Sequence, residues 1–124
     1  MKSIKLGLAA SLALFAASAF ALEIKPYSSE VFAQMQKAGI GVALHFHADW
    51  CPTCRAQEKF FNGWRGDASV PGTLLVVDYD KERDLKNKLG VRTQSTLIVF
   101  KGEKEVARLA GKTDEKSLKE ALLK

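Results

Sequence analysis

Hydrophobic and polar positions follow two rhythms along the chain, and each rhythm predicts one kind of element. Nearly continuous apolar runs predict buried strands at residues 41–47, 73–80 and 96–109. A turn at residues 101–104 divides the last run into a hairpin of two strands. Apolar residues that recur every three or four positions predict helices at residues 28–39, 52–64, 81–90 and 112–124. A short extended segment, residues 22–27, precedes the first helix.

Residues with known preferences for helix ends mark the boundaries of these helices. Ser28 and Ser29 suit the start of the first helix, and Gly39 suits its end. Gly90 is expected to end the third helix, and Thr113 is expected to cap the last one. The apolar side chains that recur on one face of each predicted helix, as core or helix-edge packing, are Val31, Phe32, Met35, Ala56, Phe60, Trp64, Leu85, Leu89, Leu118, Ala121 and Leu122.

The predicted order of elements is β-α-β-α-β-α-β-β-α. Strand–helix–strand units imply parallel strands with helices on both faces of one sheet. The hairpin near the end of the chain adds an antiparallel edge. Residues 22–124 suffice for one domain that buries its own core. We therefore expect an α/β domain with a central mixed sheet flanked by helices on both faces.

The first 21 residues have the pattern of a secretory signal peptide. Lys2 and Lys5 form a short basic region, residues 6–21 carry no charge, and residues 19–21 match an A-x-A cleavage site. The uncharged run is shorter than the about 20 residues that a membrane span needs, so an uncleaved anchor is the weaker alternative. We expect cleavage after Ala21 and a periplasmic or secreted domain of residues 22–124.

Charge changes this picture little. The whole chain has a net charge of +5, and removal of two basic residues with the signal peptide leaves 17 basic against 14 acidic residues, a net charge of +3. The basic residues are scattered among acidic ones, which is typical of solvated faces and not of a nucleic-acid-binding surface. No apolar surface stretch demands a dimer, so we expect a monomer that does not bind nucleic acid.

The two cysteines, Cys51 and Cys54, are separated by a proline and a threonine. Outside the cytosol disulfides form and persist, but a bridge across so small a loop would stabilise the fold little. Cys51 falls where the predicted strand ends and the helix begins, so free backbone N–H groups and the helix dipole favour its thiolate. These features favour a redox pair in which an exposed Cys51 attacks a partner disulfide and Cys54 resolves the mixed disulfide.

The motif ADWCPTC at residues 48–54, placed between a strand and a helix, resembles the thioredoxin superfamily. Residues 47–51 and the Glu58-Lys59 pair look most like exported thioredoxin-like domains, including the C-terminal domain of the transmembrane disulfide reductases. The resemblance implies a thioredoxin fold, a reversible Cys51–Cys54 disulfide and no dissociable cofactor. It also implies that Trp50 is a flat contact beside the site. Protein thiols and disulfides would be the partners, with a membrane electron donor or acceptor as a further candidate.

Two departures from the family concern residues around the cysteines. Pro52 and Thr53 replace the Gly-Pro pair of thioredoxins, and this dipeptide tunes the reduction potential in the family. Ser95 stands where the family has a cis-proline, so we expect a trans Gln94–Ser95 peptide bond, because a non-proline cis bond costs about 2.5–4 kcal/mol. In the family this loop pairs with the substrate backbone. The resemblance therefore implies substrate contacts at Trp50, Gln94, Ser95 and Thr96.

A third departure places histidines beneath the site. His45 stands where thioredoxins bury an acid, and His47 where they have an aromatic residue. Because strand positions two apart face the same way, both histidines are expected to lie on the face below the cysteines. His45 is a candidate for proton transfer, with a core histidine hydrogen-bonded to a backbone carbonyl as the alternative. His47 is expected to pack.

Two function classes follow from these residues. The favoured one is an exported thiol–disulfide oxidoreductase that acts on protein cysteines, and a domain without a second, substrate-holding domain favours a reductant. The alternative is a metal-binding protein in which Cys51, Cys54, His45 and His47 hold zinc or copper. Cysteines of two chains sharing an iron–sulfur cluster are a variant of that alternative.

Overall fold

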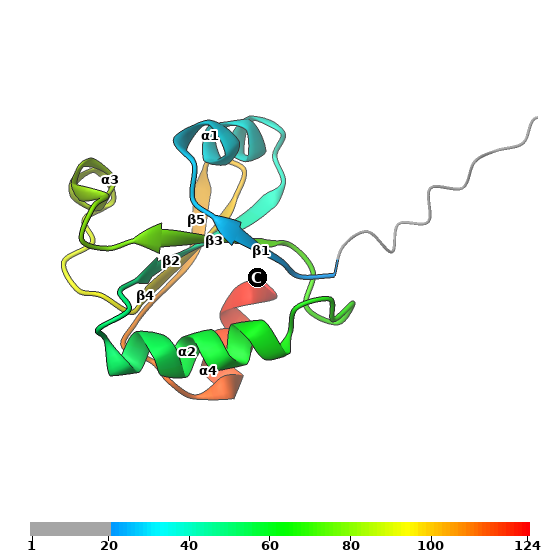
Figure 1. The fold of residues 1–124 in the computed structure, drawn as a ribbon. Helices are drawn as coiled ribbons and strands as arrows, with labels where there is room; N and C mark the ends of the chain where they lie inside the picture. Colours follow the sequence, from blue (N-terminus) through cyan, green and yellow to red (C-terminus); the bar gives the residue numbers. More distant parts are fainter. Residues whose placement is uncertain (1–20) are drawn as a thin grey trace, which may run out of the picture.

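The computed structural model describes residues 21–124, so the predicted signal peptide lies almost wholly outside the described residues. Nine elements follow in the predicted order (Figure 1). The strands are β1 (Glu23–Pro26), β2 (Gly41–His47), β3 (Thr73–Asp78), β4 (Thr96–Lys101) and β5 (Lys104–Ala110). The helices are α1 (Ser29–Lys37), α2 (Pro52–Gly63), α3 (Arg83–Leu89) and α4 (Glu115–Leu122). None of these helices has the length and apolar character needed to cross a membrane.

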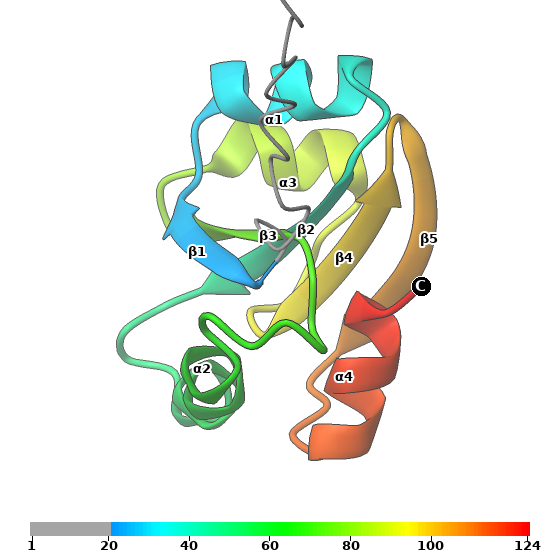
Figure 2. The same cartoon turned by 90° about the vertical axis from the view of Figure 1, so that its right-hand side faces the viewer.

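The sheet has five strands in the order β1-β3-β2-β4-β5. β1 and β2 both run parallel to β3, whereas β4 is antiparallel to β2 and to β5. Figure 2 shows α1 and α3 on one side of the sheet and α2 and α4 on the other. The predicted fold class, a mixed sheet flanked by helices on both faces, is confirmed.

Each face of the sheet has its own apolar core. Val42, Leu44 and Phe46 of β2 pack with α1 and α3 in one cluster, together with Phe32 and Leu85. Ala43 of β2 belongs to the other cluster, which contains residues of α2 and α4, among them Phe61, Trp64, Leu118 and Ala121. Because successive strand side chains alternate between faces, His45 and His47 lie on the α2 side of β2, as predicted.

Most predicted helix and strand ends are confirmed within a residue or two. Ser28 caps α1 by accepting a hydrogen bond from the Val31 backbone, and Gly90 ends α3 in the left-handed conformation at φ 67°. β3 ends at Asp78 and not at residue 80. The reason is that the Asp78 carboxylate accepts hydrogen bonds from the backbone N–H groups of Asp80 and Lys81, which folds the chain into a turn.

One detail of the helix predictions is wrong. Asp114, not Thr113, caps α4, because its carboxylate accepts a hydrogen bond from the Ser117 backbone N–H at 2.9 Å. In α2 the half-buried Phe60 packs against the core of this face, as expected, and Ala56 is half-buried as well. Helix α2 buries the side chains of Cys54, Gln57 and Phe61, and the residue at its C-terminal cap, Trp64, is buried as well. A pattern that scores only apolar residues cannot predict that a glutamine is buried.

Candidate active site

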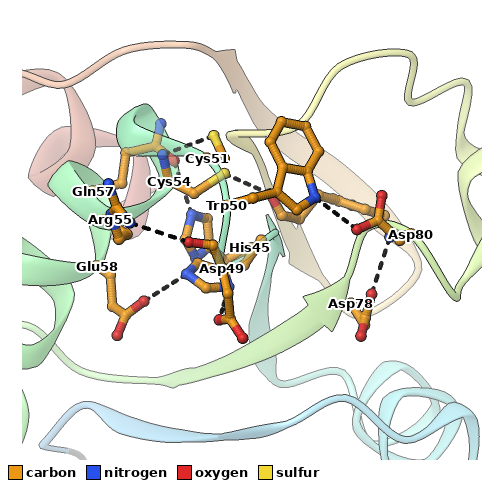
Figure 3. Close-up of polar contacts among 12 residues, drawn as sticks. His45, Asp49, Trp50, Cys51, Cys54, Arg55, Gln57, Glu58, Asp78 and Asp80 are labelled. Atoms are coloured by element: carbon orange, nitrogen blue, oxygen red, sulfur yellow. Dashed lines mark hydrogen bonds and ion pairs between the residues drawn. The ribbon is translucent and has the colours of Figure 1, made fainter.

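The N-terminus of α2 positions the two cysteines (Figure 3). Cys51 is the N-cap residue of α2, and its Sγ accepts a hydrogen bond from the Cys54 backbone N–H at 3.1 Å. Pro52 occupies the first helical position, where its missing N–H costs nothing. Both thiols are free. The predicted placement of Cys51 at the helix start is confirmed, and the orphan N–H groups of that helix end favour a negative charge on its sulfur.

Cys51 is buried, which corrects the expectation of an exposed nucleophile. Only 1% of its surface is exposed, against none for Cys54. Both sulfurs lie in a small cluster with Ala48 and the half-buried ring of Tyr79. This packing covers Cys51 although it stands at the start of the helix. Burial makes the hydrogen bonds to these sulfurs matter more, because few waters replace them.

The two thiols have opposite pKa shifts. Burial acts to raise the pKa of Cys51, but hydrogen bonds from the Cys54 thiol, the Ser95 hydroxyl and the backbone N–H groups of Cys54 and Thr53 outweigh it and lower that pKa. Burial, followed by the hydrogen bond to Cys51, raises the pKa of Cys54. The more acidic thiol is the nucleophile in disulfide exchange, so these shifts suit Cys51 for attack and Cys54 for resolution.

Ser95 lies directly against both sulfurs. Its Oγ is 3.3 Å from Cys51 Sγ and 3.1 Å from Cys54 Sγ. Residues 21–124 contain no cis peptide bond, so the Gln94–Ser95 bond is trans, as expected. Ser95 has a φ of 66°, and in this part of the chain no other residue except glycines has a positive φ. A left-handed serine costs about 1–2 kcal/mol relative to an ordinary conformation, so surrounding contacts hold it there.

Those contacts come from three directions. The Ser95 backbone N–H donates to the Phe46 carbonyl of β2 at 2.9 Å. The Ser95 carbonyl accepts from the Gly111 backbone N–H at 3.1 Å and from the Gln57 side chain at 3.0 Å. Ser95, whose hydroxyl faces the cysteines, is therefore fixed by strand β2, by the segment after β5 and by helix α2.

Gln57 is a site residue that the sequence analysis missed. Its Nε2 donates to the carbonyls of Ser95 and Lys112, the latter at 2.7 Å. Its Oε1 therefore remains to accept a hydrogen bond, and it lies 2.8 Å from Nε2 of His45. This arrangement assigns the proton of the neutral His45 ring to Nε2 and leaves Nδ1 without one. Gln57 is fully buried, and this is the reason an amide rather than a charged group is tolerated there.

His45 is a buried, neutral imidazole at physiological pH. Burial, reinforced by the neighbouring His47 and only partly offset by the hydrogen bond to Gln57, lowers the pKa of His45 to about 4. Its ring packs edge-to-face on Phe61 at 4.8 Å between centroids. Its burial and packing agree with the alternative of a core histidine, but its hydrogen-bond partner is the Gln57 side chain and not the expected backbone carbonyl. The proton-transfer role stays a prediction, restricted to the unprotonated Nδ1.

This depressed pKa predicts a loss of stability in mild acid. The unfolded chain binds a proton at His45 near pH 6.5, whereas the folded chain resists protonation down to about pH 4, so stability falls as the pH drops from 6.5 to 4. Between pH 7.5 and 4.5 the expected contribution is about 2–3 kcal/mol. Urea unfolding at several pH values measures it. In the His45→Phe variant the pH dependence over this range should flatten, and an unchanged slope would contradict the assignment.

His47 and Trp50 flank the site with different partners. His47 Nε2 lies 2.6 Å from a Glu58 carboxylate oxygen, and its ring is 5.5 Å from that of His45 between centroids. Trp50 is 58% exposed, and its indole N–H donates to an Asp80 carboxylate oxygen at 2.8 Å. Asp80 therefore holds the flat indole ring beside the cysteines, a role that the sequence did not indicate because Asp80 lies 30 residues further on.

The remaining candidates lie around the cysteines with varied accessibility. Pro52 is exposed and Thr53 half-buried on the first turn of α2. Gln94 is half-buried, whereas Thr96 is buried and its hydroxyl donates to the Thr93 carbonyl at 2.8 Å. The Thr96 side chain is thus already engaged within the fold. The substrate-contact roles of these residues stay predictions.

The metal-binding alternative gains no support from the geometry. Within residues 21–124, no three or more histidine, cysteine or acidic side chains are grouped so that they could hold a metal ion. His45 Nε2 faces Gln57, and His47 Nε2 faces Glu58, so neither nitrogen points to the sulfurs as a ligand. The arrangement of the two cysteines with Ser95 suits thiol chemistry instead.

Comparison with known proteins gives one consistent result. The thioredoxin family model matches residues 23–124. Thioredoxin of Chlamydia trachomatis is 33% identical over 96 residues, which are 77% of this chain and 91% of that protein. Thioredoxin-like protein 1 of Schizosaccharomyces pombe is 28% identical over 100 residues, but this match spans only 33% of that longer protein.

Solved structures agree with the sequence relatives. The crystal structure of Trxlp from Edwardsiella tarda superposes with a TM-score of 0.76 at 31% identity, over 81% of this chain and 98% of that one. Thioredoxin of Malassezia sympodialis superposes with a TM-score of 0.71 at 21% identity, over 82% and 91% of the two chains, which supports the fold alone. With its paired cysteines at the start of α2, the chain belongs to the thioredoxin family and is a thiol–disulfide oxidoreductase.

Proposed function

We propose that this protein is an exported reductant that passes electrons from the Cys51 and Cys54 thiols to disulfides of other proteins. The observation that carries the direction of flow is the neutral surroundings of the sulfurs. Among residues 21–124, the partners of the two sulfurs include the Ser95 hydroxyl, the Phe46 carbonyl, the Cys54 thiol and the backbone N–H groups of Thr53 and Cys54, and all of these groups are uncharged.

Neutral donors favour a reducing pair for an energetic reason. A thiolate that is strongly stabilised makes the reduced form stable and the disulfide a strong oxidant. Charge-assisted hydrogen bonds are roughly twice as strong as neutral ones, so a site without a cation on its sulfurs stabilises the thiolate less. Thr53 supplies no charge, and burial works against the Cys51 thiolate. The Cys51–Cys54 disulfide is therefore expected to be comparatively stable, which corresponds to a low reduction potential.

Export and the electron supply complete the proposal. The basic start, uncharged run and A-x-A motif of residues 1–21 support export with cleavage after Ala21. Outside the cytosol a reductant needs a source of electrons, so a membrane-embedded electron donor is the partner that this function calls for. The exposed Trp50 ring beside the cysteines offers either partner a flat contact surface.

One preparation tests both parts of the proposal. The full chain is expressed in a Gram-negative bacterium, and the periplasmic and cytoplasmic fractions are separated. The expected product is a periplasmic protein whose mass corresponds to residues 22–124. A protein that retains residues 1–21 and stays in the cytoplasmic fraction would overturn the export proposal.

The redox equilibrium of that protein against a glutathione series is then read by tryptophan fluorescence. We expect a potential near that of thioredoxin, about −270 mV, because the sulfurs lack a cationic partner. A value near −120 mV, typical of strong oxidants, would overturn the reductant proposal. The Cys54→Ser variant serves as the control, because it forms no internal disulfide and should show no such transition.

A further inference from the structure

We propose that the Ser95 hydroxyl is a catalytic hydrogen-bond donor that serves both cysteines in turn, first the Cys51 thiolate and then the Cys54 thiolate. This inference rests on thiol–disulfide exchange at Cys51 and Cys54. It does not depend on export or on the direction of electron flow, because the same two thiolates occur in exchange towards oxidation and towards reduction.

The first support is the nearly equal distance of the hydroxyl from the two sulfurs. Ser95 Oγ lies 3.3 Å from Cys51 Sγ and 3.1 Å from Cys54 Sγ, both within the range of hydrogen bonds to sulfur. A serine hydroxyl has one proton to donate and lone pairs to accept with. It can therefore donate to only one sulfur at a time, and rotation about its Cβ–Oγ bond selects which one without moving any heavy atom.

The second support is burial. Ser95 is 2% exposed, Cys51 1%, and Cys54 has no exposed surface. A thiolate in such a place loses the water molecules that would solvate it, so a fixed protein donor is worth more there than at the surface. Among the side-chain hydrogen bonds of residues 21–124, those of the Ser95 hydroxyl supply such a donor to both sulfurs.

The third support is the way in which the backbone is held. The left-handed conformation at φ 66° is unfavourable for serine, yet three hydrogen bonds maintain it. The Ser95 N–H donates to the Phe46 carbonyl, and the Ser95 carbonyl accepts from the Gly111 N–H and the Gln57 side chain. Strained residues of this kind are typical of functional sites. Here the strain has a visible consequence, which is to direct Oγ between the two sulfurs.

The hydroxyl follows the negative charge through the reaction. In the reduced protein Ser95 donates to the Cys51 thiolate, while the Cys54 thiol remains protonated. The Cys51 thiolate attacks a partner disulfide: a Cys51–partner disulfide bond forms, the partner's own bond breaks, and one partner thiolate leaves. Cys51 now has no charge, so the hydroxyl rotates and donates to Cys54.

The second step then balances the reaction. Cys54 loses its proton, and its thiolate attacks Cys51 Sγ. The internal disulfide forms, the mixed disulfide breaks, and the second partner thiolate leaves. Two electrons have passed to the partner, whose two thiols take one proton from Cys54 and one from solvent. Ser95 ends unchanged, having stabilised each thiolate in the step where it is the nucleophile.

The test uses an aromatic disulfide, dithiobis(nitrobenzoate), mixed rapidly with the reduced protein. Attack by Cys51 releases one coloured thiolate, and resolution by Cys54 releases the second, so two phases report the two cysteines. In Ser95→Ala we expect the pH midpoint of both phases to rise by about one unit, the scale of one hydrogen bond to a charged group. Thr93→Val is the matched control, because it removes a hydroxyl of the same loop that touches neither sulfur.

The Ser95→Gly variant keeps the inference testable if Ser95→Ala folds poorly, because glycine adopts a positive φ without strain. Both variants should give the same two shifts if the hydroxyl is their cause. A shift of the first phase alone would overturn the double role, and unshifted midpoints in Ser95→Gly would overturn any role of the hydroxyl. A wild-type protein that releases no coloured thiolate at all would instead overturn the exchange reaction itself and the role of Ser95 with it.

Discussion

Replacement of Cys51 by serine should abolish disulfide exchange, whereas replacement of Cys54 by serine should leave a protein that attacks partner disulfides and stays bound to them. The two substituted positions lie three residues apart, and each substitution replaces one sulfur atom by oxygen. The expected results are nevertheless opposite, because one variant should not react with a partner disulfide and the other should remain bound to it. In Cys51→Ser the rate should fall more than roughly a thousandfold, the scale seen when a nucleophile is removed.

The reason lies in the different surroundings of the two sulfurs. Cys51 accepts hydrogen bonds from Ser95, from the Cys54 thiol and from backbone N–H groups at the start of α2, and its pKa is lowered. Burial and the contact with Cys51 raise the pKa of Cys54, so it remains a thiol until Cys51 has lost its charge. A serine at position 54 cannot break the mixed disulfide, which therefore accumulates.

The measurement is insulin reduction by dithiothreitol for activity and non-reducing electrophoresis with mass spectrometry for trapped complexes. Both variants keep a side chain of nearly the same size, so thermal unfolding should be similar and serves as the control. Turnover that persists in Cys51→Ser, together with no trapped complex in Cys54→Ser, would contradict the assignment of roles.

The sequence predicted the fold well because the fold depends on local patterns. Runs such as residues 41–47 are long enough to identify a buried strand, and the glycine at position 90 identifies a helix end, where the structure gives it a φ of 67°. The place of Cys51 at the start of α2 follows from the same local logic, since a strand, a polar break and a proline mark that junction.

The network beneath the cysteines was not predictable in this way, because its partners are distant in the sequence. Gln57 bonds to His45, Ser95 and Lys112, which are 12, 38 and 55 residues away. Nothing about a glutamine in the helical segment distinguishes it from the exposed Gln34 of α1. The burial of Cys51 was missed for a similar reason, since Tyr79 and Ser95 reach it only through the tertiary fold.

The Gln57→Leu variant should unfold more easily than any exposed substitution on the helices. Leucine fills a similar volume but offers no hydrogen bond, so His45 Nε2 loses its buried acceptor and the Lys112 carbonyl loses its donor. Each unsatisfied buried group costs about 1–3 kcal/mol, so we expect a loss of about 2–4 kcal/mol in the free energy of unfolding. For a domain of this size that corresponds to a drop in melting temperature on the order of 10–30 °C.

Urea and thermal unfolding at neutral pH measure this effect, with Gln34→Leu as the matched control. Gln34 is exposed on α1 and undergoes the same change of side chain, so its effect should stay within about 0.5 kcal/mol. Equal stability of the two variants would mean that the Gln57 network contributes nothing net. A large difference would show that the Gln57 amide joins α2, β2 and the segment before α4. The same amide fixes the His45 tautomer and the Ser95 carbonyl. The geometry around the cysteines and the stability of the fold would then depend on one side chain.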